Sequence, residues 1–282
     1  DDEDSGMLSS VLSFIILPSS NREAAPVVDT GDDPNRREEA LLELVPVDPG
    51  KPYSMYKLIS LVVDNGEFFE FKRYWARNLI TGFARLDGHT VGIIASNPQD
   101  RGGCMTLDAA DKMSRFVRFC DAFNIPCIWF TDCPAFLPAI DEETRGLIRH
   151  GSRNVMTNSE ATVPKINLII RKRYGGANLV MPSKIMLTDL EAGWPSFEPG
   201  LMGAEGGVAI IYKRELQAIP DEALRKEREK KRIEEMQWGL DMQVREGTQT
   251  IIDPRETRPY LIRALKILKE VTIDLPPRKH EN

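Results

Sequence analysis

Two short apolar runs, at residues 127–130 and 166–170, constrain the fold of this chain more than any other feature. A continuous apolar run is typical of a strand covered on both faces, whereas a strand with one face in water alternates apolar and polar residues. Residues 106–123 precede the first run, and their apolar side chains recur at the spacing of one helix face. Thr106 is a candidate N-cap for that helix. We therefore predict an α/β domain in which helices pack on a sheet.

The segments before these runs predict further elements in a repeating order. We expect a helix at residues 55–63, a strand at 67–72, and a hairpin whose strands, 80–86 and 90–95, flank the turn pair Asp87-Gly88. Two strands followed by a helix recur later in the chain. The order predicts stacked ββα units, although no sequence repeat accompanies them.

The remaining segments have weaker patterns. We expect a polar helix at residues 142–157, a strand before Trp194, a helical run at 203–216, a charged helix at 223–242, a short strand at 250–252 and a last helix, capped by Asp253 or Thr257, that ends near Leu268. The first fifty residues contain polar stretches with Pro and Gly, which are typical of extended loops. We interpret residues 1–53 as a lead-in segment, which wraps over another surface or ends a preceding domain. Residues 54–282 are interpreted as the folded domain.

Charge and cysteine content argue against several classes of function. The net charge of −6 disfavours nucleic acid as the main partner, because a phosphate backbone selects basic surfaces. The four cysteines have no CxxC spacing and only three histidines accompany them, so we expect no metal site. No apolar stretch reaches the roughly 18 residues of a membrane span, and the apolar run at 7–17 follows an acidic start, unlike a secretory signal. We expect an intracellular protein, in the cytoplasm or, in a eukaryote, the mitochondrial matrix.

The most informative candidate site is the segment at residues 173–178, Arg-Tyr-Gly-Gly-Ala-Asn. A strand is expected to enter it, two glycines to turn the chain, and a short helix to follow. Backbone N–H groups at such a turn have no partner within the helix and suit an oxyanion. A purely structural turn is the alternative. The sequence contains no evident nucleophile–base pair and no Walker-type loop that would indicate another chemistry.

Two further segments are candidates for the same site. Residues 203–207 form a second glycine cluster, which either presents N–H groups or serves tight helix–sheet packing. Residues 132–139 follow a buried strand, and two prolines stiffen them. Loops beyond the carboxyl ends of such strands often form ligand sites, although an ordinary connection has the same pattern.

Several blocks, in order along nearly the whole chain, carry a resemblance to one family. They are residues 82–88 (GFARLDG), 116–126 (FVRFCDAFNIP), 148–151 (IRHG), 160–165 (EATVPK), 171–177 (RKRYGGA), 202–206 (MGAEG) and 252–258 (IDPRETR). In combination they are highly specific. The chain resembles the carboxyltransferase β subunits of propionyl-CoA and acetyl-CoA carboxylases.

The resemblance implies a crotonase-like fold of ββα units, and it matches the chain to the second of the family's two domains. It implies transfer of CO2 from carboxybiotin to the α-carbon of an acyl-CoA, with this domain binding the biotin. The biotin is carried on a partner. Further implied partners are a carboxyltransferase N-domain, a biotin carboxylase or biotin carrier subunit, acyl-CoA, and copies of this chain in a dimer-based hexamer.

The resemblance also implies roles for individual residues. The backbone N–H groups of Gly176 and Ala177 are expected to hold the biotin ureido oxygen, with little acid–base work by side chains. The implied biotin- and substrate-binding residues are Tyr174, Gly175, Asn178, Leu179, Pro134, Ala135, Phe136, Leu137, Gly203, Ala204, Glu205 and Gly206. No metal is implied in this chain.

The sequence departs from the family pattern at some of these positions. Ala135 and Ala139 replace glycines, and we expect their methyl groups to narrow the biotin channel or alter the loop. Asn178 replaces the usual tyrosine, and the apolar Leu179 indicates an acyl group longer than acetyl. Three interpretations stay open: an active carboxyltransferase half, a component of a biotin-dependent decarboxylase, and a non-catalytic scaffold subunit.

Overall fold

The computed structural model describes residues 25–186, 188–239 and 248–269, and a mixed sheet of eight strands forms its centre. The strands are β1 (Phe68–Glu70), β2 (Leu79–Leu86), β3 (His89–Ser96), β4 (Cys127–Cys133), β5 (Lys165–Tyr174), β6 (Leu190–Gly193), β7 (Glu198–Gly200) and β8 (Thr250–Ile251). Their order is β1-β2-β3-β4-β5-β6-β8, and β7 pairs with β5. The pairs β1·β2 and β2·β3 are antiparallel, and the later pairs are parallel.

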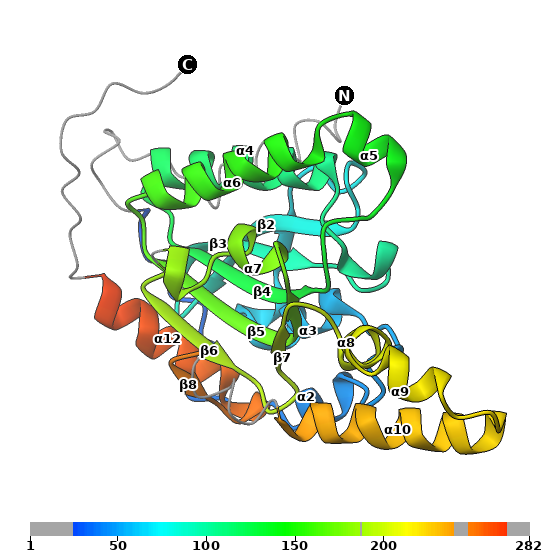
Figure 1. Ribbon diagram of the computed structural model, residues 1–282. Helices are drawn as coiled ribbons and strands as arrows, with labels where there is room; N and C mark the ends of the chain where they lie inside the picture. Colours follow the sequence, from blue (N-terminus) through cyan, green and yellow to red (C-terminus); the bar gives the residue numbers. More distant parts are fainter. Residues whose placement is uncertain (1–24, 187, 240–247, 270–282) are drawn as a thin grey trace.

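Helices cover both faces of this sheet and give the protein three layers (Figure 1). On one face lie α2 (Ala40–Leu44), α3 (Met55–Val62) and α12 (Thr257–Leu268). On the other lie α4 (Leu107–Ala122), α6 (Leu147–Glu160) and α7 (Ala177–Val180), with α5 (Ile140–Thr144) leading into α6. After β7 come α8 (Ala204–Ile211), α9 (Lys213–Gln217) and α10 (Glu222–Gly239), which extend from one corner of the molecule (Figure 1). Short 3-10 turns are η1 (Asp64–Gly66), η2 (Arg101–Gly103), η3 (Lys184–Met186) and η4 (Pro254–Glu256).

Strand β4 explains why the apolar runs lie at the centre of the fold. Successive side chains of a strand point to opposite faces. Ile128 and Phe130 therefore lie in the core with α2, α3 and α12, while Trp129 and Cys133 lie in the core with α4. All four side chains are fully buried. The prediction of a strand covered on both faces is confirmed, and with it the α/β class. In the described ranges, no helix combines the length and the apolar character that crossing a membrane requires.

Two local predictions are also confirmed. Leu86 pairs with His89 across a two-residue turn, and Asp87 and Gly88 have φ of 50° and 75°. A type I′ hairpin turn needs positive φ at both of its central residues, which Asp-Gly supplies. The Thr106 hydroxyl accepts a hydrogen bond from a first-turn amide of α4 and caps that helix.

Two predicted helices are interrupted in the structure. The helix predicted at 142–157 is wrong as one element: Gly146, with φ of 90°, separates α5 from α6. The run predicted at 203–216 is likewise two helices, because Tyr212 leaves the helical path between α8 and α9. The predicted end of the charged helix, at residues 240–242, lies outside the described residues.

Residues 25–53 pack on the sheet and its helices. The Val28 N–H donates to the Gly88 carbonyl at 3.1 Å. Leu41 of α2 is 1% exposed and lies in the core with α3 and α12. The Arg171 guanidinium donates to the Lys51 carbonyl at 3.1 Å. The lead-in segment thus contributes to the body of the fold, while the domain boundary after residue 53 stays a prediction.

Candidate functional site

Strand β5 changes its neighbours at a bend just before the predicted site. Residues 166–169 pair with β6, whereas residues 172–174 pair with β7. The pairing with β4 shifts at the same place, because Thr131 lies opposite Ile169 but Cys133 lies opposite Arg173. Bulges of this kind redirect the end of a strand and are frequent beside active sites. The bend therefore sets the direction in which β5 runs into the turn that follows it.

The turn at Gly175 and Gly176 connects β5 to α7. Gly175 has φ of 51°, which glycine adopts readily, and its N–H donates to the Gly200 carbonyl at 2.9 Å. The Gly176 carbonyl accepts the Leu179 N–H at 3.1 Å. Within the described part of the chain the Gly176 N–H has no acceptor, and Ala177 begins α7, where amides have no partner inside the helix. These are the two amides that the family resemblance assigns to an oxyanion.

The predicted loop at residues 134–137 lies against this turn. Two hydrogen bonds of 2.8 Å join its backbone to Met105 and keep it extended. The Phe136 ring occupies the space beside Gly176 and Gly151. A β-carbon added at these glycines would lie 3.0 Å and 2.6 Å from that ring. The two glycines therefore permit the close packing of Phe136 between α6 and the turn.

Tyr174, the last residue of β5, joins the turn to the third predicted segment. Its ring lies beside Gly203, where an added β-carbon would be 3.5 Å away. Its hydroxyl donates to the Glu198 carboxylate. Burial, and then this hydrogen bond, raise the pKa of Tyr174, so the hydroxyl stays protonated at neutral pH. Tyr174 therefore supports the site as a packed, hydrogen-bonded side chain and does not serve as a base.

An apolar pocket of about 500 Å³ includes Tyr174 in its wall. Leu201 and Met202 before α8, the predicted residue Ala204, and Met236 of α10 also line it. Leu201 is 86% exposed, which is unusual for a large apolar side chain. The apolar residues around Ala204 are not among the residues predicted from the sequence. Their signal is the adjacent pair Leu-Met ahead of a helix.

Other predicted residues lie at the surface. Glu205 and Gly206 are exposed in the first turn of α8, and Leu179 of α7 is 44% exposed. The side chain of Asn178 lies outside what the structure describes. The roles of these four residues in binding stay predictions.

A group of buried charges next to the turn was likewise not predicted from the sequence. Asp132 and Arg171 form an ion pair of 3.2 Å, and Arg173 and Glu191 form another of 2.8 Å. All four side chains are at most 4% exposed. Buried charges are rare and occur in pairs, because an unpaired charge is costly to remove from water. The available signal is Arg-Lys-Arg at 171–173, directly after an apolar run in the same strand.

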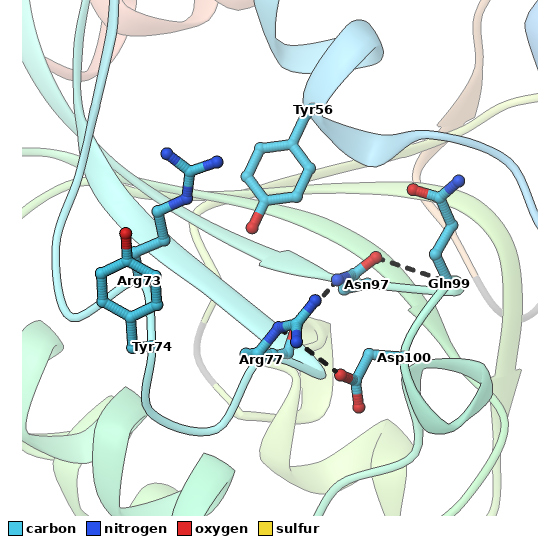
Figure 2. Close-up of a pocket in the computed structure, with 7 residues that line it drawn as sticks. All are labelled: Tyr56, Arg73, Tyr74, Arg77, Asn97, Gln99 and Asp100. Carbon is cyan, nitrogen blue, oxygen red and sulfur yellow. Dashed lines mark hydrogen bonds and ion pairs between the residues drawn. The ribbon is translucent and has the colours of Figure 1, made fainter.

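A second pocket, of about 410 Å³, lies where β3 ends (Figure 2). Its lining residues are Tyr56, Arg73, Tyr74, Arg77, Asn97, Gln99 and Asp100. Arg77 faces Asp100 at 3.9 Å, and Arg73 faces Glu70 at 3.6 Å. Burial and a hydrogen bond to Glu70 raise the pKa of Tyr56 to about 12. Opposite charges offset each other here, so this pocket has little net charge with which to select an ion.

The chemistry available at the Gly176 turn is that of main-chain amides. In the ranges that the structure describes, no cluster of three or more His, Cys, Asp or Glu side chains could hold a metal. Burial raises the pKa of Cys133, at the end of β4, to about 12, so it stays a thiol. Cys133 and Tyr174 therefore supply neither nucleophile nor base at neutral pH. Aligned amides can still stabilise a negative oxygen without any proton transfer.

The chain is similar to known proteins of one family. The family model described as "Carboxyl transferase domain" matches residues 1–282. The chain is 44% identical over 266 residues to the methylmalonyl-CoA decarboxylase subunit alpha of Veillonella parvula, covering 94% of this chain and 51% of that one. It is 42% identical over 267 residues to the propionyl-CoA carboxylase carboxyltransferase subunit of Haloferax mediterranei, covering 94% and 52%. The chain thus spans about half the length of the curated relatives it matches.

Among solved structures, the fold matches transcarboxylase 12S, a hexamer crystallised with methylmalonyl-CoA and methylmalonic acid. The TM-score is 0.87 at 37% identity, over 98% of this chain and 53% of that one. Carboxyltransferases have the crotonase-like fold, so the sequence-based fold prediction is confirmed. The family match over the whole length and the close structural agreement together show that this chain belongs to the carboxyl transferase domain family.

Proposed function

We propose that this chain forms the biotin-binding half of the active site in a biotin-dependent acyl-CoA carboxyltransferase. The observation that carries the proposal is the open N–H of Gly176. It lies at a turn that is held between Phe136 and the β5–β7 pair, in a chain of the carboxyl transferase family. A donor of this kind, at a position where glycine permits close approach, suits an oxygen that becomes negative during reaction.

The residues of the turn fit the urea ring of biotin. Biotin, when bound, carries the carboxyl group and presents a ureido oxygen that gains negative charge when the carboxyl group leaves. Gly176 and Ala177 would donate their N–H groups to this oxygen and fix its position. Phe136 would limit water beside the turn, and Tyr174 would hold the end of β5 in place. The chain's own contribution is binding, orientation and charge stabilisation.

The remaining parts of the proposal concern the other half and the partners. We infer that residues 54–282 face a carboxyltransferase N-domain that holds the acyl-CoA, and that a biotin carrier or biotin carboxylase subunit delivers the biotin. Copies of this chain would assemble into a dimer-based hexamer, and the hexamer of transcarboxylase 12S supports that number of copies. The location would be the cytoplasm or, in a eukaryote, the mitochondrial matrix; a mouse relative at 40% identity is mitochondrial by name.

Decarboxylation is the second candidate for the direction of the reaction. Two relatives, at 44% and 40% identity, are methylmalonyl-CoA decarboxylase alpha subunits. The same turn would stabilise the same oxygen in both directions, so the site geometry favours neither. Reconstitution with ATP, bicarbonate and a biotin carboxylase tests net carboxylation. If no net carboxylation is observed while methylmalonyl-CoA rapidly releases CO2, the reaction runs as a decarboxylation.

The variant Gly176→Val tests whether the chain is catalytic or a scaffold. The assay combines this chain with the other half of the carboxyltransferase, which the relatives carry in the same polypeptide; the two halves together are called the complete domain. It follows the biotin-stimulated conversion of methylmalonyl-CoA to propionyl-CoA. We expect kcat to fall by about 100-fold or more, because valine blocks the approach to the amide and displaces Phe136. Unchanged turnover in a variant that assembles normally would instead assign a scaffold role.

A further inference from the structure

We propose that Asp132 is a positioning residue for this carboxyl transfer: its carboxylate fixes the bend in β5 that aims the Gly176 turn. The inference rests on the proposed function of that turn. Asp132 lies at the end of β4 and is 1% exposed. It touches no part of the turn itself in the interactions described above, so it would act through β5.

The carboxylate of Asp132 lies where the β4·β5 ladder is broken. Between the pairs Thr131–Ile169 and Cys133–Arg173, β5 takes four steps while β4 takes two. The regular backbone ladder cannot serve all of the β5 amides in such a bulge. Asp132 Oδ1 accepts the Lys172 N–H at 3.0 Å and so occupies the place of a ladder carbonyl.

Lys172 is the residue at which β5 joins β7. Residues 166–169 follow β6, and Lys172 is the first to pair with β7, opposite Glu198. From there only Arg173 and Tyr174 separate it from the glycine turn. A bond that fixes Lys172 therefore fixes the direction of the last strand residues and, with them, the position of the Gly176 amide.

Other groups hold Asp132 from several sides. Its own N–H donates to Ser96 Oγ at 3.2 Å, on β3. Its second oxygen lies 3.2 Å from the buried Arg171 guanidinium. Arg171 in turn lies 5.2 Å from the centre of the Tyr53 ring and donates to the Lys51 carbonyl.

The lead-in segment also reaches the bend directly. Lys172 Nζ donates to the Pro49 carbonyl at 2.6 Å. The carboxylate thus sits at a junction of β3, β4, β5 and residues 49–53. We conclude that a change in the Asp132 acceptor is transmitted along β5 toward the turn, three residues beyond Lys172 at Gly175.

Two double variants separate this role from general stability. In Asp132→Asn/Arg171→Gln, charge is removed but an amide oxygen still accepts the Lys172 N–H. In Asp132→Leu/Arg171→Met, an apolar pair of similar size leaves that N–H without an acceptor. Replacing a buried ion pair by apolar residues often preserves stability, whereas removing one partner alone leaves a buried charge. Both variants therefore change both partners together.

The control is a similar ion pair at a distant turn. Asp64 pairs with Arg258 at 2.7 Å and accepts the Asp87 and Gly88 amides at 3.0 and 2.8 Å, at the β2–β3 hairpin. Asp64→Leu/Arg258→Met likewise removes a buried ion pair and an acceptor of backbone N–H groups, but far from the Gly176 turn. It is expected to leave kcat unchanged.

The measurement is biotin-stimulated turnover of methylmalonyl-CoA by the complete domain, with thermal unfolding measured in parallel. We expect the Leu/Met variant to lose about 100-fold in kcat with little change in KM for the acyl-CoA, because a shift of about 1 Å in a catalytic group has that effect. The Asn/Gln variant should keep most of its kcat. Equal turnover in the two variants would overturn the proposal.

Hydrogen exchange of the peptide covering residues 172–179 tests the same inference without turnover. Exchange should be faster in the Leu/Met variant than in the Asn/Gln variant, and equal exchange would contradict the role of Asp132. If the unsubstituted protein has no biotin-dependent turnover, the proposed function fails. The difference in hydrogen exchange between the two variants still tests whether Asp132 positions the turn. If the Leu/Met variant does not fold, Asp132→Ser/Arg171→Gln is used, since serine is too short to reach Lys172, and the same loss of kcat is expected.

Discussion

Proline at position 177 would remove one amide hydrogen from the Gly176 turn while leaving the local fold nearly unchanged. Ala177 is the first residue of α7. Proline is well tolerated at the first helical position, because its fixed φ suits the helix and its missing N–H has no helical partner there. The variant Ala177→Pro therefore tests the proposed donor itself, with little cost to the helix.

The expected loss follows from what one such donor contributes. Removing a single donor from an oxyanion site raises the barrier by about 3 kcal/mol, or about 100- to 1,000-fold in kcat. The Gly176 N–H remains, so activity should fall by this amount and not vanish. KM for the acyl-CoA should change little, because the lost hydrogen bond strengthens only as charge develops on the oxygen.

The assay is biotin-stimulated conversion of methylmalonyl-CoA to propionyl-CoA by the complete domain, with Ala177→Gly as the matched control. Glycine keeps the N–H and costs the short helix about 1 kcal/mol, so any helix effect appears in the control. Thermal unfolding of both variants reports their stability. If Ala177→Pro has the same kcat as the control, the amide at 177 is not a donor to the reacting oxygen, and the oxyanion assignment must be withdrawn.

Three further predictions concern neighbouring residues. Leu179→Asp should lower kcat/KM for propionyl-CoA relative to acetyl-CoA by about tenfold, because the predicted apolar contact with the additional methylene of propionyl-CoA is lost. Competition between the two substrates measures this ratio. Phe136→Ala should lower the free energy of unfolding by about 2 kcal/mol, less than for a fully buried ring, because Phe136 is only partly buried against Gly151 and Gly176; urea denaturation would measure this. Burial, and then the charge of Lys269, lower the pKa of His89 below its ordinary value of 6.5, so the fold favours the neutral ring. Stability should therefore fall as pH drops from 6.5 toward that lowered pKa, and His89→Gln should remove this part of the loss; an unchanged pH dependence of Tm in the variant would contradict it.

The fold could be predicted where a short sequence pattern is compatible with only one local structure. The apolar run in β4 required cover on both faces, and Asp87-Gly88 allowed the positive φ that the hairpin needs. Helix ends were less predictable. Gly146 separates α5 from α6 because it adopts φ of 90°. The sequence alone could not show this, since a glycine in a polar segment is equally compatible with a continuous helix that is somewhat less stable.

The candidate site could be predicted in part for a similar reason. Glycines and prolines mark turns, so the segments around Gly176 and Phe136 were identifiable, and the structure brings them together. The buried pair of Asp132 and Arg171 could not be identified, because charged residues in a sequence are usually exposed. Their burial depends on a bulge, which is a property of strand pairing and has no fixed sequence signature.

A site made of main-chain amides has a particular consequence for substitutions. The proposed amide donors cannot be deleted by changing side chains, except by proline, so substitutions of exposed residues that line the pocket, such as Leu201, should have modest effects. The residues that direct the backbone should have large effects, although they do not touch the ligand. In this fold they include Asp132, which substitutes for a ladder carbonyl, and Phe136, which packs on the turn. A scan in which exposed lining residues reduced kcat more than these two would show that side chains, and not the aligned amides, carry the chemistry.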